Sequence, residues 1–449
     1  MKKKDTIAYV MSVSGNAIPN IREYAKANSK DYRILLIADK KRPLNEAAND
    51  CDEYIAIDFS RPEMISEALL PYQDRLIAIT CLGDANMARF GKIIPNVPYL
   101  RTPTTESLEW ATDKYAMRKR FNAYDSSITP KFSIIKENTK AERTRIVEKV
   151  GFPMIVKPTN LAGSLFVQIC YHEDELQKAL GVGFRKIQKA YENDGRLETP
   201  KILAEQFMEG DMYSVDSYVD SRGHIYHCPL VRVKTGRDIG HKDFYGYLQV
   251  TPTVLKKETI ERAQTVTEHA IHALGLRSTS AHTELMKVDS DWKVVEVGAR
   301  IGGARDILYE LSCDIKHTTN DILIRMPKKP VIPKKCKGYA AYMKWFASKE
   351  GVITEMKGIK KIEQLESFHK LNINKKIGDK SVFASHGGRS VFNLYLYNSE
   401  RSKLLADIRR VEQMVEVKVT SGRTQSVAPK TTFVKSVKKV PLKKVSKKK

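Results

Sequence analysis

The chain has 449 residues and is 42% hydrophobic, which indicates a soluble protein of two to four domains with sizeable cores. Its formal net charge is +24, and ten of these charges lie in Ser421–Lys449, which leaves +14 for residues 1–420. No stretch reaches the roughly 18 consecutive apolar residues that a membrane span requires, so we expect no transmembrane helix.

The first 110 residues alternate short apolar runs with polar, helix-like stretches. This rhythm predicts a small parallel α/β domain over residues 1–110. Its expected strands are Ile7–Val13, Arg33–Ala38, Tyr54–Asp58 and Leu76–Cys81. We do not expect the basic residues before the first strand to form a signal peptide, because Asp5 interrupts them and the apolar run is very short. The turn Ser14–Asn16 lacks the G-x-G-x-x-G pattern of a dinucleotide site.

A second, two-lobed domain is expected over residues 111–330. Thr112 or Asp113 is placed to cap a helix, and residues 185–199 have the composition of an exposed, charged connection. The other expected strands and helices are Lys131–Ile135, Thr139–Val150, 152–158, Leu165–Tyr171, a helix from Glu173, a strand from Ile202, Tyr213–Val219, His224–Val233, Glu258–Leu274 and a hairpin at 281–298.

The remaining residues divide into a small α+β domain over 331–420 and a basic tail. Ser421–Lys449 contains Pro429 and Pro441, no acidic residue and no apolar periodicity, so we predict that it is disordered. Such a tail binds nucleic acid or an anionic membrane surface electrostatically, or it serves solubility alone. The composition leaves both readings open.

The cysteines predict reduced thiols. They form no CxxC pair, and most lie in apolar runs such as Ile79–Leu82. This pattern indicates buried thiols in a reducing compartment and no zinc site, so we expect a cytoplasmic protein. The six are Cys51, Cys81, Cys170, Cys228, Cys313 and Cys336.

The predicted hairpin carries the most informative pattern in the chain. If it folds about Ser290, Glu284 and Glu296 stand opposite each other on one face, shared with Met286, Val288, Trp292 and Val294. Their Cβ atoms would lie roughly 5 Å apart, where two like charges destabilise a sheet unless a cation lies between them. Oxygen ligands at this spacing suit Mg²⁺, which completes its shell with water and phosphates. The alternative is a surface hairpin neutralised by Lys287 and Lys293, but the pleat places these odd-numbered residues on the other face.

Two further segments predict contacts with a nucleotide. Lys157 ends an apolar strand beside the loop residues Gly163 and Ser164, whose backbone N–H groups and hydroxyl suit a phosphate. Glu205 interrupts an apolar strand that leads into Gln206 and Phe207, a segment able to supply an acceptor, a backbone donor and an apolar wall to adenine. Each also has a plain reading: a lysine that enters solvent, and an edge-strand glutamate that faces water.

Taken in order, these motifs resemble the ATP-grasp superfamily, especially its carboxylate–amine ligases, with a domain order like that of biotin carboxylase. The resemblance covers residues 1–420 and lies in the set rather than in one motif. It implies that Lys114, Lys157, Gly163 and Ser164 contact ATP phosphates, that Glu205, Gln206 and Phe207 contact adenine, that Glu284 and Glu296 bind Mg²⁺ or Mn²⁺, and that Arg300 holds the reacting carboxylate and the transferring phosphoryl group.

The chain departs from the family pattern at three positions. The acidic residue that often binds ribose falls at Met212, and we expect its neighbour Asp211 to replace it. Gly298 stands where a third metal ligand, Asn, is common, which implies a looser second Mg²⁺. Phe166 stands where the phosphate loop often has glycine, which implies a stiffer loop.

The resemblance implies an ATP- and Mg²⁺-dependent ligase that joins a carboxylate to an amine, of the amino-acid or peptide type, through an acyl phosphate, with release of ADP and phosphate. Its partners would be two small molecules, recognised near the loop Lys234–Tyr247 unless that loop is merely solvated. Two alternatives stay open. One is a bicarbonate-activating enzyme like biotin carboxylase; the other is a non-catalytic ATP-binding protein whose basic tail binds nucleic acid or a membrane.

Overall fold

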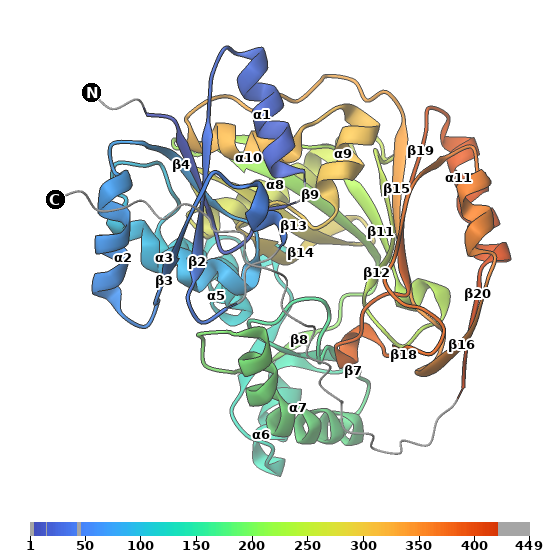
Figure 1. Ribbon diagram of the computed structural model, residues 1–449. Helices are drawn as coiled ribbons and strands as arrows, with labels where there is room; N and C mark the ends of the chain where they lie inside the picture. Colours follow the sequence, from blue (N-terminus) through green and yellow to red (C-terminus); the bar gives the residue numbers. More distant parts are fainter. Residues whose placement is uncertain (1–3, 15, 43–45, 421–449) are drawn as a thin grey trace.

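The computed structural model describes residues 4–14, 16–42 and 46–420, and its mixed α/β architecture confirms the predicted fold class (Figure 1). A parallel sheet, a small antiparallel lobe and a large antiparallel sheet follow one another along the chain. The predicted tail, Ser421–Lys449, lies outside the described residues. Among the described residues, no helix is both long and apolar enough to cross a bilayer.

The N-terminal sheet has four parallel strands in the order β3-β2-β1-β4. They are β1 (Thr6–Val10), β2 (Arg33–Asp39), β3 (Glu53–Ile57) and β4 (Leu76–Cys81). Helices α1 (Ala17–Ala27), α2 (Pro62–Leu69), α3 (Met87–Ile93) and α4 (Thr105–Thr112) accompany it. Alternate residues of β1 belong to different clusters: Ile7 and Tyr9 pack with α1, whereas Ala8 and Val10 pack with α2 and α3. Both faces are therefore buried, which explains the continuous apolar runs.

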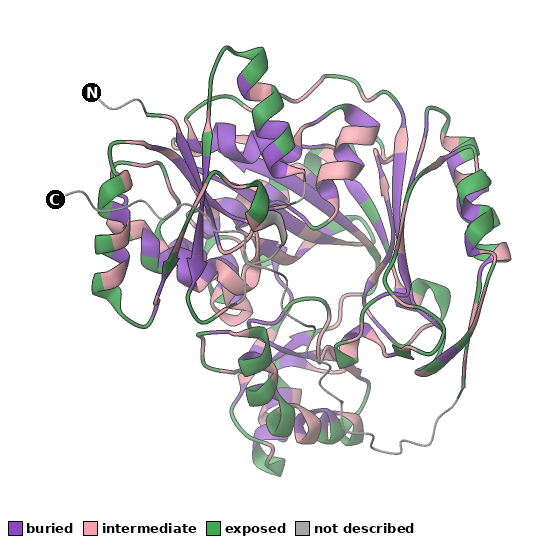
Figure 2. Ribbon diagram, in the orientation of Figure 1, coloured by how far each residue is buried: buried purple, intermediate pink, exposed green. Residues whose placement is uncertain are grey.

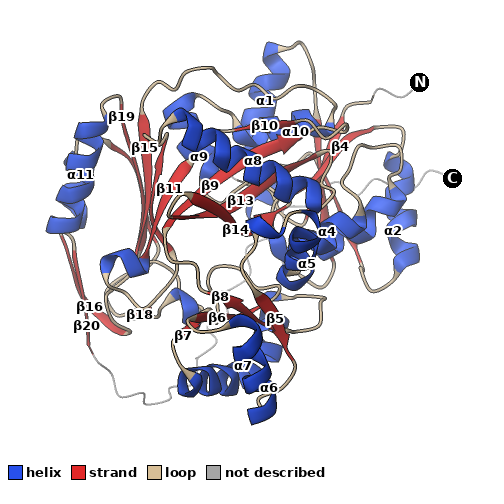
Figure 3. Ribbon diagram, turned by 180° about the vertical axis from the view of Figure 1, so that it is seen from behind, coloured by secondary structure: helices blue, strands red, loops and turns tan. Residues whose placement is uncertain are grey.

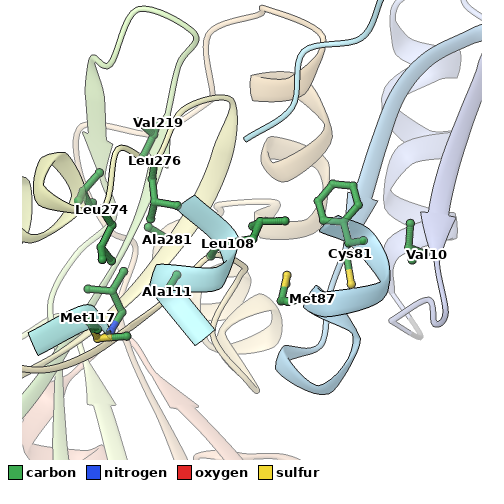
Figure 4. Packing of buried hydrophobic residues seen from close by; sticks show 14 of the residues in the cluster. Val10, Cys81, Met87, Leu108, Ala111, Met117, Val219, Leu274, Leu276 and Ala281 are labelled. Atoms are coloured by element: carbon green, nitrogen blue, oxygen red, sulfur yellow. Dashed lines mark hydrogen bonds between the residues drawn. The ribbon is translucent and has the colours of Figure 1, made fainter. Parts of the chain in front are cut away.

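One hydrophobic core connects this sheet with the rest of the molecule. Figure 4 shows it running from Val10 through Met87 and Leu108 to Ala281 of the large sheet. The N-terminal domain is thus fixed against the domain that follows it.

The small lobe is a four-stranded antiparallel sheet in the order β5-β8-β6-β7. Its strands are β5 (Phe132–Ile135), β6 (Met154–Pro158), β7 (Gln168–Cys170) and β8 (Ile202–Gln206), and helices α6 (Lys140–Val150) and α7 (Glu173–Asp194) cover it. Two predictions were wrong here. The strand expected over Leu165–Tyr171 is confined to β7, and α7 continues through much of the predicted connection at 185–199 because Ile187 and Tyr191 are buried against the lobe.

The large sheet is antiparallel, in the order β14-β13-β9-β11-β12-β15-β19-β17, with β10 paired to β9. Its strands are β9 (Asp211–Val219), β10 (Ile225–His227), β11 (Val231–Thr235), β12 (Gly246–Thr251), β13 (Thr279–Val288), β14 (Asp291–Gly298), β15 (Tyr339–Trp345), β17 (Phe368–Ile373) and β19 (Phe392–Asn398). The predicted strand His224–Val233 is therefore two strands, β10 and β11. The sheet also passes without interruption across residue 330, where a domain boundary is predicted.

Helices α5 (Lys114–Tyr124), α8 (Lys257–Ala273), α9 (Arg305–Cys313) and α10 (His317–Arg325) accompany this sheet, and α8 and α9 cross its face in the rear view (Figure 3). Beyond it lie β16 (Gly351–Lys357), β18 (Lys380–Ser381), β20 (Glu416–Thr420) and α11 (Arg401–Met414). Burial is concentrated in the strands, whereas the outer faces of α2, α7 and α11 are exposed (Figure 2).

The prediction that all six cysteines are reduced was wrong for one pair. Cys313, at the end of α9, forms a disulfide with Cys336, which lies just before β15. The two cysteines are 23 positions apart in the sequence but adjacent in space, and composition alone does not reveal this proximity. Cys81, Cys170 and Cys228 are buried thiols, as expected.

Candidate active site

The β13–β14 hairpin pairs Glu284 directly with Glu296, as predicted, but by a different route. The turn is one residue shorter than expected, since Val288 pairs with Asp291 and Asp289 adopts a positive φ of 51°. A bulge at Val295, between the partners of Glu284 and Leu285, restores the register. The shift places Val294 opposite Leu285 in the core, so the predicted common face with Trp292 and Val294 was wrong.

Each carboxylate of this pair has its own cationic neighbour. Lys114 Nζ lies 3.0 Å from Glu296 Oε2, and His282 Nε2 lies 3.6 Å from Glu284 Oε1. Burial alone would raise the pKa of Glu284, but His282 and Arg300 hold it below its usual value. The two hairpin lysines do not neutralise the pair: Lys287 donates to the Asp289 carbonyl and Lys293 to the Ser127 carbonyl. Register places Lys293 opposite Met286, so the prediction that it occupies the other face was wrong.

The pair lines a cavity of about 890 Å³ between the small lobe, the large sheet and the C-terminal strands. All but one of the predicted site residues line it: Lys114, Lys157, Gly163, Ser164, Glu205, Gln206, Phe207, Glu284, Glu296 and Arg300. The exception is Asp211. Its exposed carboxylate pairs with Arg232 at 2.8 Å, while Met212 lines the cavity, so the expected role of Asp211 as a ribose ligand stays a prediction without support from this geometry.

Glu205 is 2% exposed and lies at the centre of a buried ion cluster. Arg118 donates from Nε to Oε1 at 2.7 Å and from an NH2 group to Oε2 at 3.2 Å, and Lys157 Nζ lies 2.6 Å from Oε2. Burial would raise the pKa of Glu205, but Arg118 and Lys157 together lower it to about 2. These contacts use three of the roughly four lone-pair positions of a carboxylate, so one acceptor position on Oε1 is not used by them.

The loop around Gly163 and Ser164 has an unusual backbone. Gly163, Ser164 and Phe166 have φ values of 68°, 64° and 58°, a left-handed conformation that glycine adopts more easily than other residues. The Phe166 N–H donates to the Ser385 carbonyl at 3.0 Å, which joins this loop to the C-terminal strands. The loop thus spans the cavity between the small lobe and the C-terminal region.

Arg300 leaves β14 into the cavity and is held by a residue from the N-terminal domain. Its Nε donates to Asp84 Oδ1 at 3.0 Å, and an NH2 group donates to Oδ2 of the same carboxylate. Burial would lower the pKa of Arg300, but Asp84 raises it, so the guanidinium stays charged. The bidentate geometry fixes the plane in which Arg300 meets a ligand.

Sequence reasoning missed three residues of the site, although each has a sequence signal. Arg118 follows Lys114 by one helical turn on α5, which places both on one face. Asp84 follows the carboxyl end of β4, the edge where ligands of parallel sheets are bound. His282 precedes Glu284 by two strand positions, and its Nδ1 lies 3.1 Å from buried Asp216, which orients the ring.

The donor set fits Mg²⁺ and a polyphosphate. Among the described residues, no cluster of three or more His, Cys, Asp or Glu side chains is poised to hold a metal, so the Glu pair offers two carboxylates alone. One or two carboxylates completed by water and substrate phosphates is the usual protein environment of Mg²⁺. Lys114, Lys157 and Arg300 supply positive charge around the same space.

Comparison with known proteins agrees with this geometry. Residues 150–306 match the family model described as the ATP-grasp domain. Alanine–anticapsin ligase of Bacillus subtilis is 29% identical over 223 residues, a match that spans 45% of this chain and 44% of that protein. An uncharacterized protein, y4rH, of Sinorhizobium fredii is 24% identical over 352 residues, 75% of this chain and 69% of that protein.

The fold extends the likeness beyond the matched domain. The crystal structure of an L-amino acid ligase from Bacillus licheniformis superposes with a TM-score of 0.72 at 17% identity, and the match covers 94% of this chain and 100% of that one. Residues 150–306 are thus an ATP-grasp domain, and the chain is similar to alanine–anticapsin ligase in sequence and to an L-amino acid ligase in fold. The predicted resemblance to the ATP-grasp superfamily is confirmed.

Proposed function

We propose that this chain joins a carboxylate of an amino-acid-like substrate to an amine through an acyl phosphate and releases ADP and phosphate. The observation that carries the proposal is the direct pairing of Glu284 with Glu296 in a cavity that also contains Lys157 and Arg300. A site that merely stored ATP would need neither the fixed guanidinium nor the paired carboxylates at the reacting end.

The residues divide into a nucleotide end and a reacting end. Glu205, Gln206 and Phe207 line the nucleotide end, where adenine would lie, and Lys114 and Lys157 would hold the phosphates. Mg²⁺, bound by Glu284 and Glu296, would neutralise phosphate charge when present. At the reacting end, Arg300 would orient the substrate carboxylate and offset the charge that develops on the phosphoryl oxygens.

The reaction then has two balanced steps. A carboxylate oxygen attacks the γ-phosphorus of ATP, the bond from that phosphorus to the β–γ bridging oxygen breaks, and ADP leaves. The amine nitrogen attacks the acyl carbon, phosphate leaves with one oxygen of the original carboxylate, and the nitrogen loses a proton. Arg300, held by Asp84, is positioned to stay charged through both steps.

Isotope transfer tests this route directly. The full-length protein is incubated with MgATP and pairs of amino acids whose carboxylates carry ¹⁸O, and the products are analysed by mass spectrometry. We expect ADP, an amide, and one ¹⁸O in each phosphate released. AMP and pyrophosphate as products, or phosphate without ¹⁸O, contradict the acyl-phosphate route. ADP release that depends on bicarbonate and biotin instead supports the carboxylase alternative.

A further inference from the structure

The C-terminal strands form a part of the cavity wall that the proposed ATP chemistry does not use. Tyr342 and Lys344 lie two residues apart on β15, so both side chains project from the same face of the sheet. Across the strands, Gln249 pairs with Tyr342 and Asn393 pairs with Lys344. All four residues line the cavity, which makes this sheet face a continuous polar surface.

Hydrogen bonds hold the far end of this surface in place. Asn374 Nδ2 donates to Ser390 Oγ at 3.0 Å, and Ser390 Oγ donates to Asn393 Oδ1 at 2.7 Å. The chain leads from this network directly to Arg389, which also lines the cavity. The wall is therefore ordered by its own contacts rather than by a ligand.

The cations of this wall differ from those at the nucleotide end. Lys114, Lys157 and Arg300 each have a carboxylate within 4.0 Å, from Glu296, Glu205 and Asp84 respectively. In the part of the chain that the structure describes, Lys344 and Arg389 have none. Lys344 is half-buried and contacts the ring of Tyr342, 5.9 Å from its centroid, and Arg389, which is exposed at the rim, has no hydrogen bond or ion pair there.

An unpaired cation at Lys344 is costly for the protein. Burial lowers the pKa of Lys344, and the nearby positive charge of Arg305 lowers it further, while Glu284 opposes this effect. Lys344 lines the same cavity as Glu284 and Glu296. A charge held there without a partner is the usual mark of a site whose counter-ion arrives with a ligand.

We propose that Lys344 and Arg389 bind an anionic group, a carboxylate or a phosphate, of the substrate other than ATP. The group is additional to the carboxylate or amine that reacts, so the substrate class is an amino compound or acid with a second negative charge. This assignment rests on the proposed ligase function. It places the substrate between Arg300, which meets the reacting carboxylate, and the C-terminal wall.

Pairs of near-isosteric amino acids test the assignment. ADP release by the full-length protein is measured with aspartate against asparagine, glutamate against glutamine, and O-phosphoserine against serine, each combined with a panel of neutral amino acids. Because a hydrogen bond to a charged group contributes about 1.5–3 kcal/mol, we expect kcat/KM to favour a charged member at least about tenfold. Preference for phosphoserine or for the dicarboxylic acids identifies which anion is bound.

Variants separate the subsite from the rest of the cavity. We expect Lys344→Gln and Arg389→Gln each to lower the charged-to-neutral preference about tenfold, with kcat for neutral pairs little changed. Lys349→Gln, an exposed lysine further along the same segment, is the matched control and should retain the preference. Amide formation that favours neutral members, or a preference that both variants retain, overturns the subsite while leaving the ligase proposal intact.

A binding measurement keeps the two proposals distinguishable. Calorimetry of aspartate and O-phosphoserine with the MgADP-bound protein needs no turnover. Binding of either anion that is lost in Lys344→Gln and kept in Lys349→Gln supports the subsite even if no amide forms, and in that case only the ligase proposal fails. Equal binding by the wild-type protein and Lys344→Gln refutes the subsite.

Discussion

Replacement of Glu205 by Gln should destabilise the protein markedly, although the side chain keeps its shape. Glu205 is the only carboxylate within 4.0 Å of Arg118 and Lys157 among the described residues, and all three side chains are nearly fully buried. Loss of its charge leaves two buried cations without a counter-ion. Such a break costs about 3–5 kcal/mol.

Two contacts place the expected value at the lower end of that range. Arg118 keeps its hydrogen bonds to the Val294 and Val295 carbonyls, at 3.0 and 2.6 Å, and the Gln oxygen still accepts one donor. We therefore expect the free energy of unfolding to fall by about 3 kcal/mol, measured by urea titration at pH 7. Glu209→Gln, an exposed glutamate of the same hinge, should change it by less than about 0.5 kcal/mol.

The pH dependence gives an independent check. The folded-state pKa of Glu205, about 2, lies below its ordinary value of 4.5, so folding favours the ionised carboxylate. This stabilisation is complete above pH 4.5 and is lost as the pH falls toward 2. The wild-type protein should lose its advantage over Glu205→Gln across that window. A loss below about 1 kcal/mol at pH 7 would refute the ion-cluster reasoning, since it would mean that the two cations are adequately solvated.

Three other substitutions test the reacting end. Glu296→Gln should lower kcat by a factor of about 10² or more and weaken the Mg²⁺ dependence of ADP binding. We expect no gain in stability, because Lys114 and His282 already offset the Glu284–Glu296 repulsion. Normal turnover would show that the carboxylate pair is not part of the active site. Asp84→Asn should lower kcat/KM for the carboxylate substrate at least about tenfold by freeing Arg300, with little effect on ADP affinity; unchanged kinetics would show that Arg300 needs no support. Gly302→Ala should destabilise the fold by about 1–3 kcal/mol, because its Cβ would lie 2.5 Å from His282 Nδ1, whereas Gly303→Ala has open space and should unfold in urea like the wild type.

Local patterns predicted the site well where the chemistry lies within one segment. The Glu284–Glu296 pairing follows from alternation in two adjoining strands, and β4 was predicted over its observed residues, Leu76–Cys81. The turn and the bulge were not predictable. The turn is one residue shorter than expected and the bulge adds one residue to β14, so the two shifts cancel and Glu284 still pairs with Glu296. The correct pair therefore came with the wrong neighbours, as Trp292 and Val294 lie on the core face.

Long-range pairing was the part that the sequence left hidden. Asp84 and Arg300 are 216 positions apart, and Arg118 and Glu205 are 87 apart. No periodicity links such residues, since their meeting depends on how the N-terminal sheet and α5 pack against the hairpin. The pairing of β15 with β12 in the large sheet was also not predicted. The proline-rich connection before β15 suggested a domain boundary there, and no local pattern links the two strands.

The charge distribution of the cavity follows from these long-range pairs. Lys114 is paired with Glu296, whereas Lys157 and Arg118 share the single carboxylate of Glu205, so this cluster retains one excess positive charge. On the proposed function, a polyphosphate arriving with a divalent cation would allow an exchange in which the lysines pair with the phosphates and Glu296 pairs with the metal. The exchange would supply the negative charge that the cluster around Glu205 lacks. Among the described residues Lys344 and Arg389 have no such partner, and on the proposed subsite their counter-ion comes with the other substrate.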